Sequence, residues 1–211
     1  MPRKGSLIIV SGPSGAGKSA LASAVISRLK DLHFSVSYTT RAPRGDERDG
    51  VEYHFVRKAE FEGLIRGNEF LEWAEVYGNY YGTARKFIDD TLSSGKDVLL
   101  DVDVQGARTM RRKRPDAISI FIMPPSYQVL RRRLENRKLD KDYVIEQRLK
   151  IARREIVQYK DYDYLIVNDD FDESVKELEA IILGSRCQMT SRAESAEAIV
   201  ATFGGLDAEY P

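Results

Sequence analysis

Eight consecutive residues near the start of the chain combine glycines with a lysine and a hydroxyl group: Gly12, Pro13, Ser14, Gly15, Ala16, Gly17, Lys18 and Ser19. They follow directly on the apolar run Leu7–Val10, which is typical of a buried strand. Glycines let successive main-chain N–H groups point at phosphate oxygens, while Lys18 can reach the β- and γ-phosphates and Ser19 can bind Mg²⁺. The alternative is a flexible surface turn, which the strand before the loop argues against. The sequence therefore predicts a site for a nucleoside triphosphate.

A second group of phosphate-binding side chains lies in residues 37–55. This segment contains Arg41 and Arg44, with the hydroxyl groups of Ser37 and Tyr53 close by in sequence. The planar guanidinium group makes paired charge-assisted hydrogen bonds to phosphate, and a tyrosine hydroxyl adds a donor at a fixed reach. Taken alone, two arginines in a loop are more often solvated. Beside a triphosphate site, they predict a phosphotransferase that acts on a phosphorylated acceptor.

The elements that must position these residues alternate between strands and helices. Apolar runs predict further strands at 98–100, 118–122 and 164–167, each followed by a segment that suits a helix. Residues 20–30 carry apolar side chains at helical spacing. This alternation predicts an α/β fold with a parallel sheet flanked by helices.

We expect one domain over residues 1–211, interrupted by two insertions. Residues 35–84 are rich in aromatic residues, glycine and arginine, and residues 126–159 are dominated by charge. Residues 186–211 lose strong apolar patterning and are expected to form a loosely packed tail, for which the sequence indicates no function.

Composition argues against several classes of protein. The 33 Lys and Arg residues balance 33 Asp and Glu, so net charge draws the chain neither to nucleic acid nor to an anionic membrane. Cys187 is the single cysteine, which rules out an internal disulfide, and with only His33 and His54 it forms no zinc cluster. Since a reducing compartment fits this usage and no long apolar segment is present, we expect a cytoplasmic protein.

Six segments, in their order and spacing, resemble guanylate kinases, which phosphorylate GMP with ATP: GPSGAGKS, SVSYTTRAPR with DGVEYHF, FLEWAEVYGNYYGT, LLDVDVQGA, FIMPPS and DYLIVNDD. The similarity runs from Ser6 to Asp172. It implies a P-loop NTPase core, a GMP-binding subdomain over 35–84 and a mobile helical lid over 126–159. The implied reaction takes ATP and GMP, with dGMP as a further acceptor, requires Mg²⁺ and belongs to purine nucleotide metabolism.

At the GMP end, the resemblance implies a role for each matching position. Guanine would face Ser37, Glu72 and Thr83. The GMP phosphate would bind Arg41, Arg44, Tyr53 and Tyr81. Asp101 and Asp103 would lie at a strand end beside the guanine and the metal.

At the ATP end, the resemblance adds residues from the lid and from the last strand to the glycine loop. The lid would supply Arg133, Arg137 and Arg148, of which Arg137 and Arg148 reach the ATP phosphates. Asn168 and Asp169 would border the adenine. The implied catalytic residues are Lys18, Arg44, Arg137 and Arg148, and the implied Mg²⁺ ligands are Ser19 and Asp101.

Physical chemistry gives Glu72 a reason to select guanine. A carboxylate accepts hydrogen bonds from guanine N1–H and the 2-amino group together, whereas adenine has an unprotonated N1 and no 2-amino group. The alternative is a solvated glutamate in a strand that begins at Phe70. Asp101 ends an apolar run, where a carboxylate can meet substrate or a metal-bound water, whereas Asp103 could simply cap a helix that begins near Val104.

The lid departs from the family pattern. Members usually carry glycine beside the lid arginine, but residues 136–143 contain none, so charge chemistry at Arg137 and Arg148 should survive while hinge flexibility differs. The basic clusters at 111–114 and 131–132 match no family role, and we expect both to be solvated helix faces, the first near a helix C-terminus.

Two other classes of protein share part of this pattern. Guanylate-kinase-like modules of scaffold proteins bind peptides without catalysis, but the intact Lys18–Ser19 pair and the lid arginines argue against that class here. A kinase for another phosphorylated acceptor, such as a ribose bisphosphate, would share the glycine loop but would not need Glu72 to face guanine.

Overall fold

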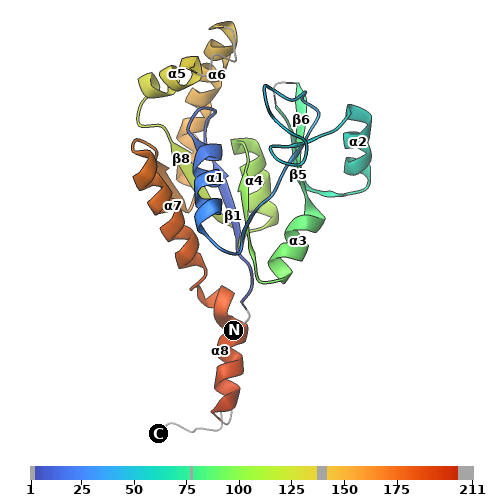
Figure 1. Cartoon of the computed structure of the whole chain (residues 1–211), viewed down its shortest axis with the longest axis vertical. Coiled ribbons are helices and arrows are strands. Elements are labelled where there is room, and N and C mark those ends of the chain that lie inside the picture. The colour runs from blue at the N-terminus through green and yellow to red at the C-terminus, as the bar shows by residue number, and fades with distance from the viewer. Residues whose placement is uncertain (1–2, 77, 137–141, 204–211) are drawn as a thin grey trace.

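The computed structural model describes residues 3–76, 78–136 and 142–203, which form two sheets and the helices around them (Figure 1). The strands are β1 (Leu7–Ser11), β2 (Leu32–Phe34), β3 (Tyr38–Thr39), β4 (His54–Phe55), β5 (Phe70–Val76), β6 (Asn79–Ala84), β7 (Asp97–Asp101), β8 (Ile118–Met123) and β9 (Tyr164–Val167). The helices are α1 (Lys18–Arg28), α2 (Lys58–Arg66), α3 (Arg85–Ser93), α4 (Val104–Lys113), α5 (Tyr127–Asn136), α6 (Asp142–Glu155), a 3₁₀ helix (Ile156–Asp161), α7 (Phe171–Ser185) and α8 (Met189–Thr202).

The core sheet is parallel and confirms the predicted α/β class. Its strand order is β2, β7, β1, β8, β9, and all four pairs of neighbouring strands run parallel. Central β1 pairs Val10 with Asp101 of β7 on one side and with Ile120 of β8 on the other. Strand β2 is not among the predicted strands, because its three residues are too few to show a strand period and include His33.

The first insertion folds as a second sheet, which the sequence does not predict. Its strand order is β4, β3, β6, β5, and the antiparallel pair β5–β6 places Glu72 directly opposite Thr83. Helix α2 packs Phe61 against Phe70, with ring centroids 4.6 Å apart. A Cβ at Gly82 would stand 2.9 Å from Phe61 and 3.0 Å from Phe70, so these rings fit only over a glycine. The aromatic residues of this insertion therefore form its own small core.

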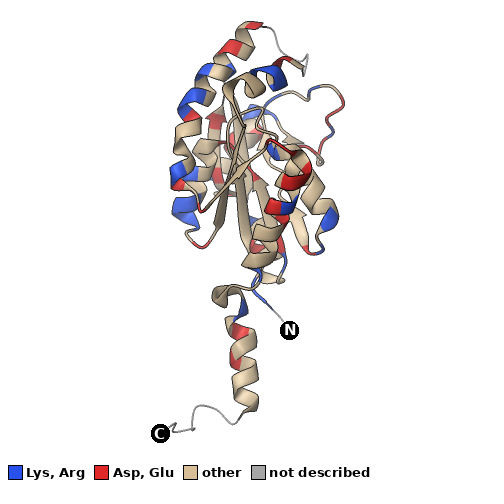
Figure 2. Ribbon diagram, turned by 90° about the vertical axis from the view of Figure 1, so that its left-hand side faces the viewer, with Lys and Arg blue, Asp and Glu red and all other residues tan. Residues whose placement is uncertain are grey.

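Helix α8 extends away from the rest of the molecule in two perpendicular views (Figures 1 and 2). Near its start, the Lys4 main-chain N–H donates to the Ser191 carbonyl at 3.2 Å, whereas Phe203 just after its end is 83% exposed. The segment predicted as a loosely packed tail thus contains a helix, and its residues 204–211 lie outside the described part of the chain.

The length and hydropathy of the described helices show whether any of them could span a membrane. Not one of them is both long enough and apolar enough to cross a bilayer.

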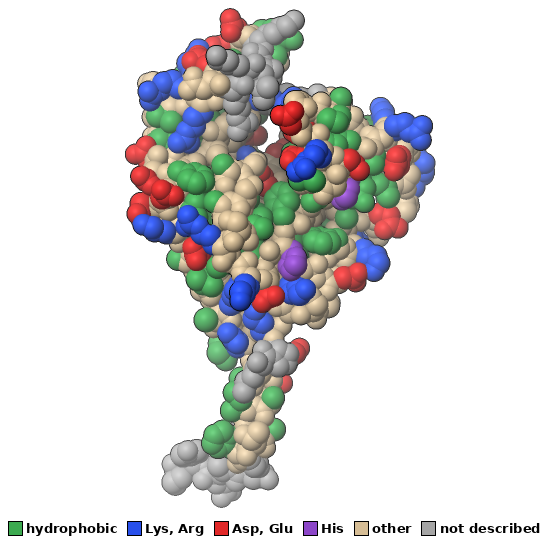
Figure 3. Space-filling model, in the orientation of Figure 1, with side chains coloured by type: hydrophobic (Ala, Val, Ile, Leu, Met, Phe, Trp, Pro, Cys, Tyr) green, Lys and Arg blue, Asp and Glu red, His purple; other side chains and the backbone are tan. Residues whose placement is uncertain are grey.

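Helices α5 and α6 fill the second insertion. They pack together through an apolar cluster that includes Leu134 and Leu149. Arg131 pairs with the exposed Glu146 at 2.7 Å on the surface, and Arg132 is exposed, in agreement with the solvated face predicted for these two residues. The molecule is hollowed between these helices and the second sheet (Figure 3).

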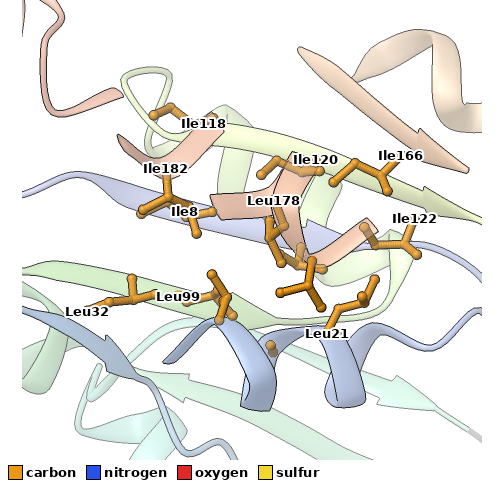
Figure 4. Packing of buried hydrophobic residues seen from close by; sticks show 14 of the residues in the cluster. Ile8, Leu21, Leu32, Leu99, Ile118, Ile120, Ile122, Ile166, Leu178 and Ile182 are labelled. Atoms are coloured by element: carbon orange, nitrogen blue, oxygen red, sulfur yellow. The ribbon is translucent and has the colours of Figure 1, made fainter. Parts of the chain in front are cut away.

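Two apolar cores hold the parallel sheet between its helices. Ile8 of β1 packs on one face with Leu21 of α1 and Leu178 of α7 (Figure 4). Leu7 and Ile9 belong to the second core, on the face covered by α3 and α4. Burial of this kind contributes about 25 cal/mol per Å² of apolar surface removed from water. The packing holds the carboxyl ends of β1 and β7 side by side, and the candidate site lies at this edge.

Candidate functional site

A cleft of about 730 Å³ opens at the carboxyl edge of the parallel sheet, where Figure 3 shows the molecule hollowed. Its walls come from the glycine loop, the second sheet, the end of β7 and helix α6. The predicted site residues that line it are Gly12, Ser14, Gly15, Gly17, Lys18, Ser19, Ser37, Arg41, Arg44, Tyr53, Glu72, Tyr81, Asp101, Asp103 and Arg148. The fold therefore gathers most of the predicted triphosphate and acceptor residues around one space.

The glycine loop joins β1 to α1 through left-handed backbone. Gly12 has φ 140° and Gly17 has φ 99°, conformations that side chains oppose. A Cβ at Gly12 would also collide with the Ile122 carbonyl oxygen, and one at Gly17 would collide with the Asn168 amide. The loop thus packs tightly against β8 and Asn168, which leaves its other side for a ligand.

Lys18 and Ser19 point in different directions from the start of α1. The Lys18 ammonium donates to the carbonyl oxygens of Gly12 at 2.8 Å and Pro13 at 3.3 Å, so it lies back over the loop. The Ser19 hydroxyl donates to an Asp101 carboxylate oxygen at 2.6 Å. The pairing of β1 with β7 therefore brings together the two predicted Mg²⁺ ligands, which come from distant parts of the sequence.

The described residues contain no group of three or more His, Cys, Asp or Glu side chains that could hold a metal ion. Ser19 and Asp101 supply oxygen atoms only, the ligand type that Mg²⁺ prefers. A cation at this pair would therefore need further ligands from water or from the phosphates of a bound nucleotide.

Asp103 takes the role of helix cap that the sequence left open. Its carboxylate accepts the Gly106 main-chain N–H at 2.8 Å and caps α4. Burial raises the pKa of Asp103, against the effect of this hydrogen bond. The side chain also lines the cleft, and its contact with substrate stays a prediction.

The acceptor side of the cleft holds a cluster of arginine and tyrosine side chains. The Arg41 guanidinium lies 5.2 Å from the centroid of the Tyr53 ring, and the Tyr53 and Tyr81 rings are 5.8 Å apart. Burial, together with the negative charge of Asp101, raises the pKa of Tyr53 to about 12, so its hydroxyl stays protonated and can donate. Arg44 is exposed at the edge of the cleft.

Glu72 is buried in the cleft wall, with 4% of its surface exposed. The alternative of a solvated glutamate is therefore wrong. The Thr83 hydroxyl donates to one carboxylate oxygen at 2.5 Å, so Thr83 orients Glu72 from behind. Burial raises the pKa of Glu72 to about 7, and the Thr83 hydrogen bond opposes that rise. Near neutral pH the ionised and protonated forms of this side chain are therefore populated to a similar extent.

The raised pKa of Glu72 predicts a pH-dependent cost in stability. Between pH 4.5 and about 7 the unfolded chain loses the proton while the folded chain keeps it, so stability falls as pH rises. Above pH 7 the cost reaches about 3 kcal/mol. Urea denaturation should find Glu72→Gln more stable than the wild type by about 2–3 kcal/mol at pH 8, and the gain should shrink towards pH 5. An equal gain at both pH values would contradict this account.

The cleft lining does not include Arg133 of the predicted lid or the two residues predicted to border the adenine, Asn168 and Asp169. The Asn168 amide donates to the Ala16 carbonyl at 2.7 Å, and Arg133 donates to the Asn168 carbonyl at 2.8 Å. Both side chains thus support the glycine loop from behind in this structure. Asp169 is exposed beside them, and Arg137 lies outside the described residues.

The basic cluster at 111–114 lies at the C-terminus of α4 as predicted, with Arg112 and Lys113 exposed, whereas Arg111 and Arg114 are half-buried. Arg111 lies 5.2 Å from the Tyr162 ring centroid, and Lys113 donates to the Leu71 carbonyl at 2.6 Å. Arg114 bonds to Asp116 at 3.1 Å. The Lys113 hydrogen bond joins α4 to the strand that carries Glu72.

Three carboxylates that line the cleft were not among the predicted site residues: Glu47, Glu52 and Glu155. Glu155 is the last residue of α6 and stands two helical turns after Arg148, so helical spacing could have placed both on one face. Burial raises the pKa of Glu155, with the positive charge of Lys18 acting against it. Glu47 follows Arg44 by three residues, a spacing typical of a turn.

Comparison with known proteins shows the family to which the chain belongs. The sequence model of the guanylate kinase family matches residues 4–184. The guanylate kinase of Vibrio vulnificus (strain YJ016) is 52% identical over 192 residues, which cover 90% of this chain and 93% of that protein. The guanylate kinase of Rickettsia bellii is 48% identical over 183 residues, which cover 87% of this chain and 96% of that protein.

A solved structure gives the same result. The crystal structure of guanylate kinase from Anaplasma phagocytophilum matches with a TM-score of 0.80 at 35% identity, over 95% of this chain and 96% of that one. The sequence match spans nearly all of the described cleft residues. This chain therefore belongs to the guanylate kinase family.

Proposed function

We propose that the cleft transfers the γ-phosphoryl group of ATP to GMP, and also to dGMP, giving ADP and the nucleoside diphosphate. The observation that carries the proposal is the junction of two sites in one space. Lys18 and the glycine loop form one wall, and Arg44 and buried Glu72 belong to the other. A phosphotransferase needs this arrangement, because the acceptor must lie next to the γ-phosphoryl group of the donor so that the group is transferred to the acceptor and not to water. Since both substrates are nucleotides of the cell interior, we place the reaction in the cytoplasm.

The donor end uses the glycine loop and the lid. Main-chain N–H groups of the loop and the N-terminus of α1 would hold the triphosphate, with the Lys18 ammonium moving from the loop carbonyls to the phosphates. Arg148 is buried in the cleft on α6 and would add a second positive charge. From the lid, Arg133 and Arg137 would also bind ATP, and Arg137 would reach its phosphates. Asn168 and Asp169 would border the adenine.

Ser19 and Asp101 would hold Mg²⁺, because their oxygen atoms already lie 2.6 Å apart at the edge of the cleft. Bound there with ATP, the ion would offset the negative charge of the triphosphate. The Ser19 hydroxyl would then turn a lone pair to the metal and give up its bond to Asp101.

The acceptor end would bind the guanine base and the phosphate of GMP through different residues. Ionised Glu72 would accept from guanine N1–H and the 2-amino group, supported by Thr83 and joined by Ser37 and Asp103 at the base. Arg41, Arg44, Tyr53 and Tyr81 would bind the phosphate. A GMP phosphate oxygen would then attack the γ-phosphorus in line, without a phosphorylated enzyme intermediate.

A steady-state assay tests the proposal. ATP is offered with GMP, dGMP, AMP, CMP, UMP or a ribose bisphosphate, and formation of ADP is followed. Turnover with GMP and dGMP far above the other acceptors is expected. Preference for the ribose bisphosphate would favour the related kinase class, and no turnover with any acceptor would favour a binding module.

The phosphate clamp gives a separate prediction for Arg44. Arg44→Ala should raise KM for GMP by about tenfold, with a lower kcat, because a charge-assisted bond to the acceptor phosphate is lost. KM for ATP should change little. Arg48→Ala is the matched control, since Arg48 is an exposed arginine of the same loop that does not line the cleft. Equal kinetics in the two variants would remove Arg44 from the site.

A further inference from the structure

Glu47 is the carboxylate that both clamp arginines share. One of its oxygens accepts from Arg41 Nη1 at 2.9 Å and the other from Arg41 Nη2 at 3.0 Å, which makes a two-bonded ion pair. The first oxygen also accepts the Arg44 main-chain N–H at 2.8 Å. A single side chain thus fixes a guanidinium group and the backbone that carries the neighbouring arginine.

The remaining contacts of Arg41 hold its guanidinium group in place from other sides. Arg41 Nη1 also donates to the Ala42 carbonyl at 2.7 Å, and the Tyr53 and Phe55 rings lie 5.2 Å and 5.8 Å from the guanidinium carbon. Burial lowers the pKa of Arg41, but hydrogen bonds with Glu47 and Tyr81 outweigh it and leave the pKa raised. Three of the five guanidinium N–H groups are therefore committed to Glu47 and Ala42.

The loop between the two arginines is closed by the same residue. The Glu47 main-chain N–H donates to the Arg44 carbonyl at 3.1 Å, while the Glu47 side chain accepts the Arg44 N–H. Gly45 within this turn has φ 54°, a left-handed conformation. Glu47 is therefore built into the turn by main chain and side chain together.

We propose that Glu47 is a positioning residue that presents Arg41 and Arg44 together to the acceptor phosphate. This inference rests on the proposed function of the clamp and adds a residue to it. Glu47 holds one edge of Arg41, so that the other N–H groups of that guanidinium are directed at the phosphate. Through the turn, it also sets the point from which the exposed Arg44 side chain reaches the cleft.

A different role for Glu47 would be to occupy the place of the phosphate when no nucleotide is bound. That role needs a carboxylate that leaves on binding. The hydrogen bonds of Glu47 to the Arg44 backbone oppose such a departure, because swinging out would unmake the turn as well as the ion pair. The two roles predict opposite changes in GMP affinity when the carboxylate is weakened.

Glu47→Gln tests the inference with almost no change in volume. The amide oxygen can keep the bonds to Arg41 Nη1 and to the Arg44 N–H, but its NH₂ group would then face Arg41 Nη2, donor against donor. The ion pair is lost, and Arg41 is held by one hydrogen bond to this side chain instead of two. Calorimetry on the full chain should find GMP binding weakened by about tenfold or more.

Guanosine separates positioning of the phosphate clamp from general damage to the subdomain, because it has the base and no phosphate. Affinity for guanosine should stay within about twofold of the wild type in Glu47→Gln. Asp46→Asn is the matched control: it removes one negative charge at an adjacent exposed residue outside the cleft lining and should alter neither ligand. The thermal unfolding midpoint of each variant is measured alongside.

Three results would overturn the inference. The first is unchanged GMP affinity in Glu47→Gln. The second is tighter GMP binding in that variant, which would mean that Glu47 occupies the place of the phosphate. The third is an equal loss of affinity for GMP and for guanosine. Arg44→Ala in the same series separates this failure from failure of the proposed function. If Arg44→Ala weakens GMP binding and Glu47→Gln does not, the role inferred for Glu47 is wrong while the phosphate clamp still stands. If Arg44→Ala has no effect, the clamp itself is wrongly assigned.

Discussion

Replacing Lys18 with alanine should lower kcat by about 10³-fold or more while the protein stays folded. In the structure the ammonium group lies over the loop, bonded to the carbonyls of Gly12 and Pro13. Triphosphate competes for the same group, and charge develops on its oxygens as the γ-phosphoryl group leaves. Without Lys18 that charge is poorly offset, so the transition state loses more stabilisation than the ground state.

The loss of turnover in Lys18→Ala should exceed the loss of ATP affinity. Single-turnover kinetics and ATP titration of the same variant measure the two effects. Lys30→Ala, a change at an exposed lysine just beyond α1, provides the control and should behave as the wild type. Turnover near the wild-type value in Lys18→Ala would remove the glycine loop from catalysis. A fall in the unfolding midpoint would instead show that the two carbonyl bonds stabilise the loop.

The parallel core was predictable because buried strands leave a strong mark in the sequence. Central β1 is apolar on both faces, since Leu7 and Ile9 enter one core and Ile8 the other. Strand β2 left no such mark, because a three-residue edge strand has too few side chains to show a period. The second sheet also escaped prediction, since its residues read as aromatic and polar, and its own small core formed by Phe61 and Phe70 depends on long-range pairing.

The site was predictable for residues whose own side chain does the chemistry. It was less predictable for residues whose role depends on contacts with other parts of the chain. Lys18 and Glu72 fall within recognisable motifs and line the cleft as expected. Asn168 was expected to border a base, yet its amide holds the Ala16 carbonyl, a contact that no local pattern encodes. Glu47 was missed for a similar reason: its spacing from Arg44 predicts a turn, but no local pattern shows that its carboxylate pairs with Arg41, six residues earlier.

Replacing Glu72 with glutamine should lower kcat/KM for GMP by about tenfold to a few hundredfold. The buried carboxylate already accepts the Thr83 hydroxyl, and its two oxygens match the two guanine donors. The amide keeps one acceptor and turns the other into a donor, so one guanine N–H group would face an N–H group. AMP should not lose in parallel, because adenine N1 can accept from the new NH₂ group, and the preference for GMP over AMP should narrow.

The pH dependence of KM for GMP gives the same residue a second test. Because the pKa of Glu72 is raised to about 7, the unliganded wild type binds a proton there at lower pH, and GMP must displace it. KM for GMP should therefore rise as pH falls below 7 in the wild type and stay flatter in Glu72→Gln. The control is Glu75→Gln, a change on the same strand at an exposed side chain outside the cleft lining. Equal losses toward GMP and AMP in Glu72→Gln, or unchanged discrimination in a folded variant, would mean that another residue reads the base.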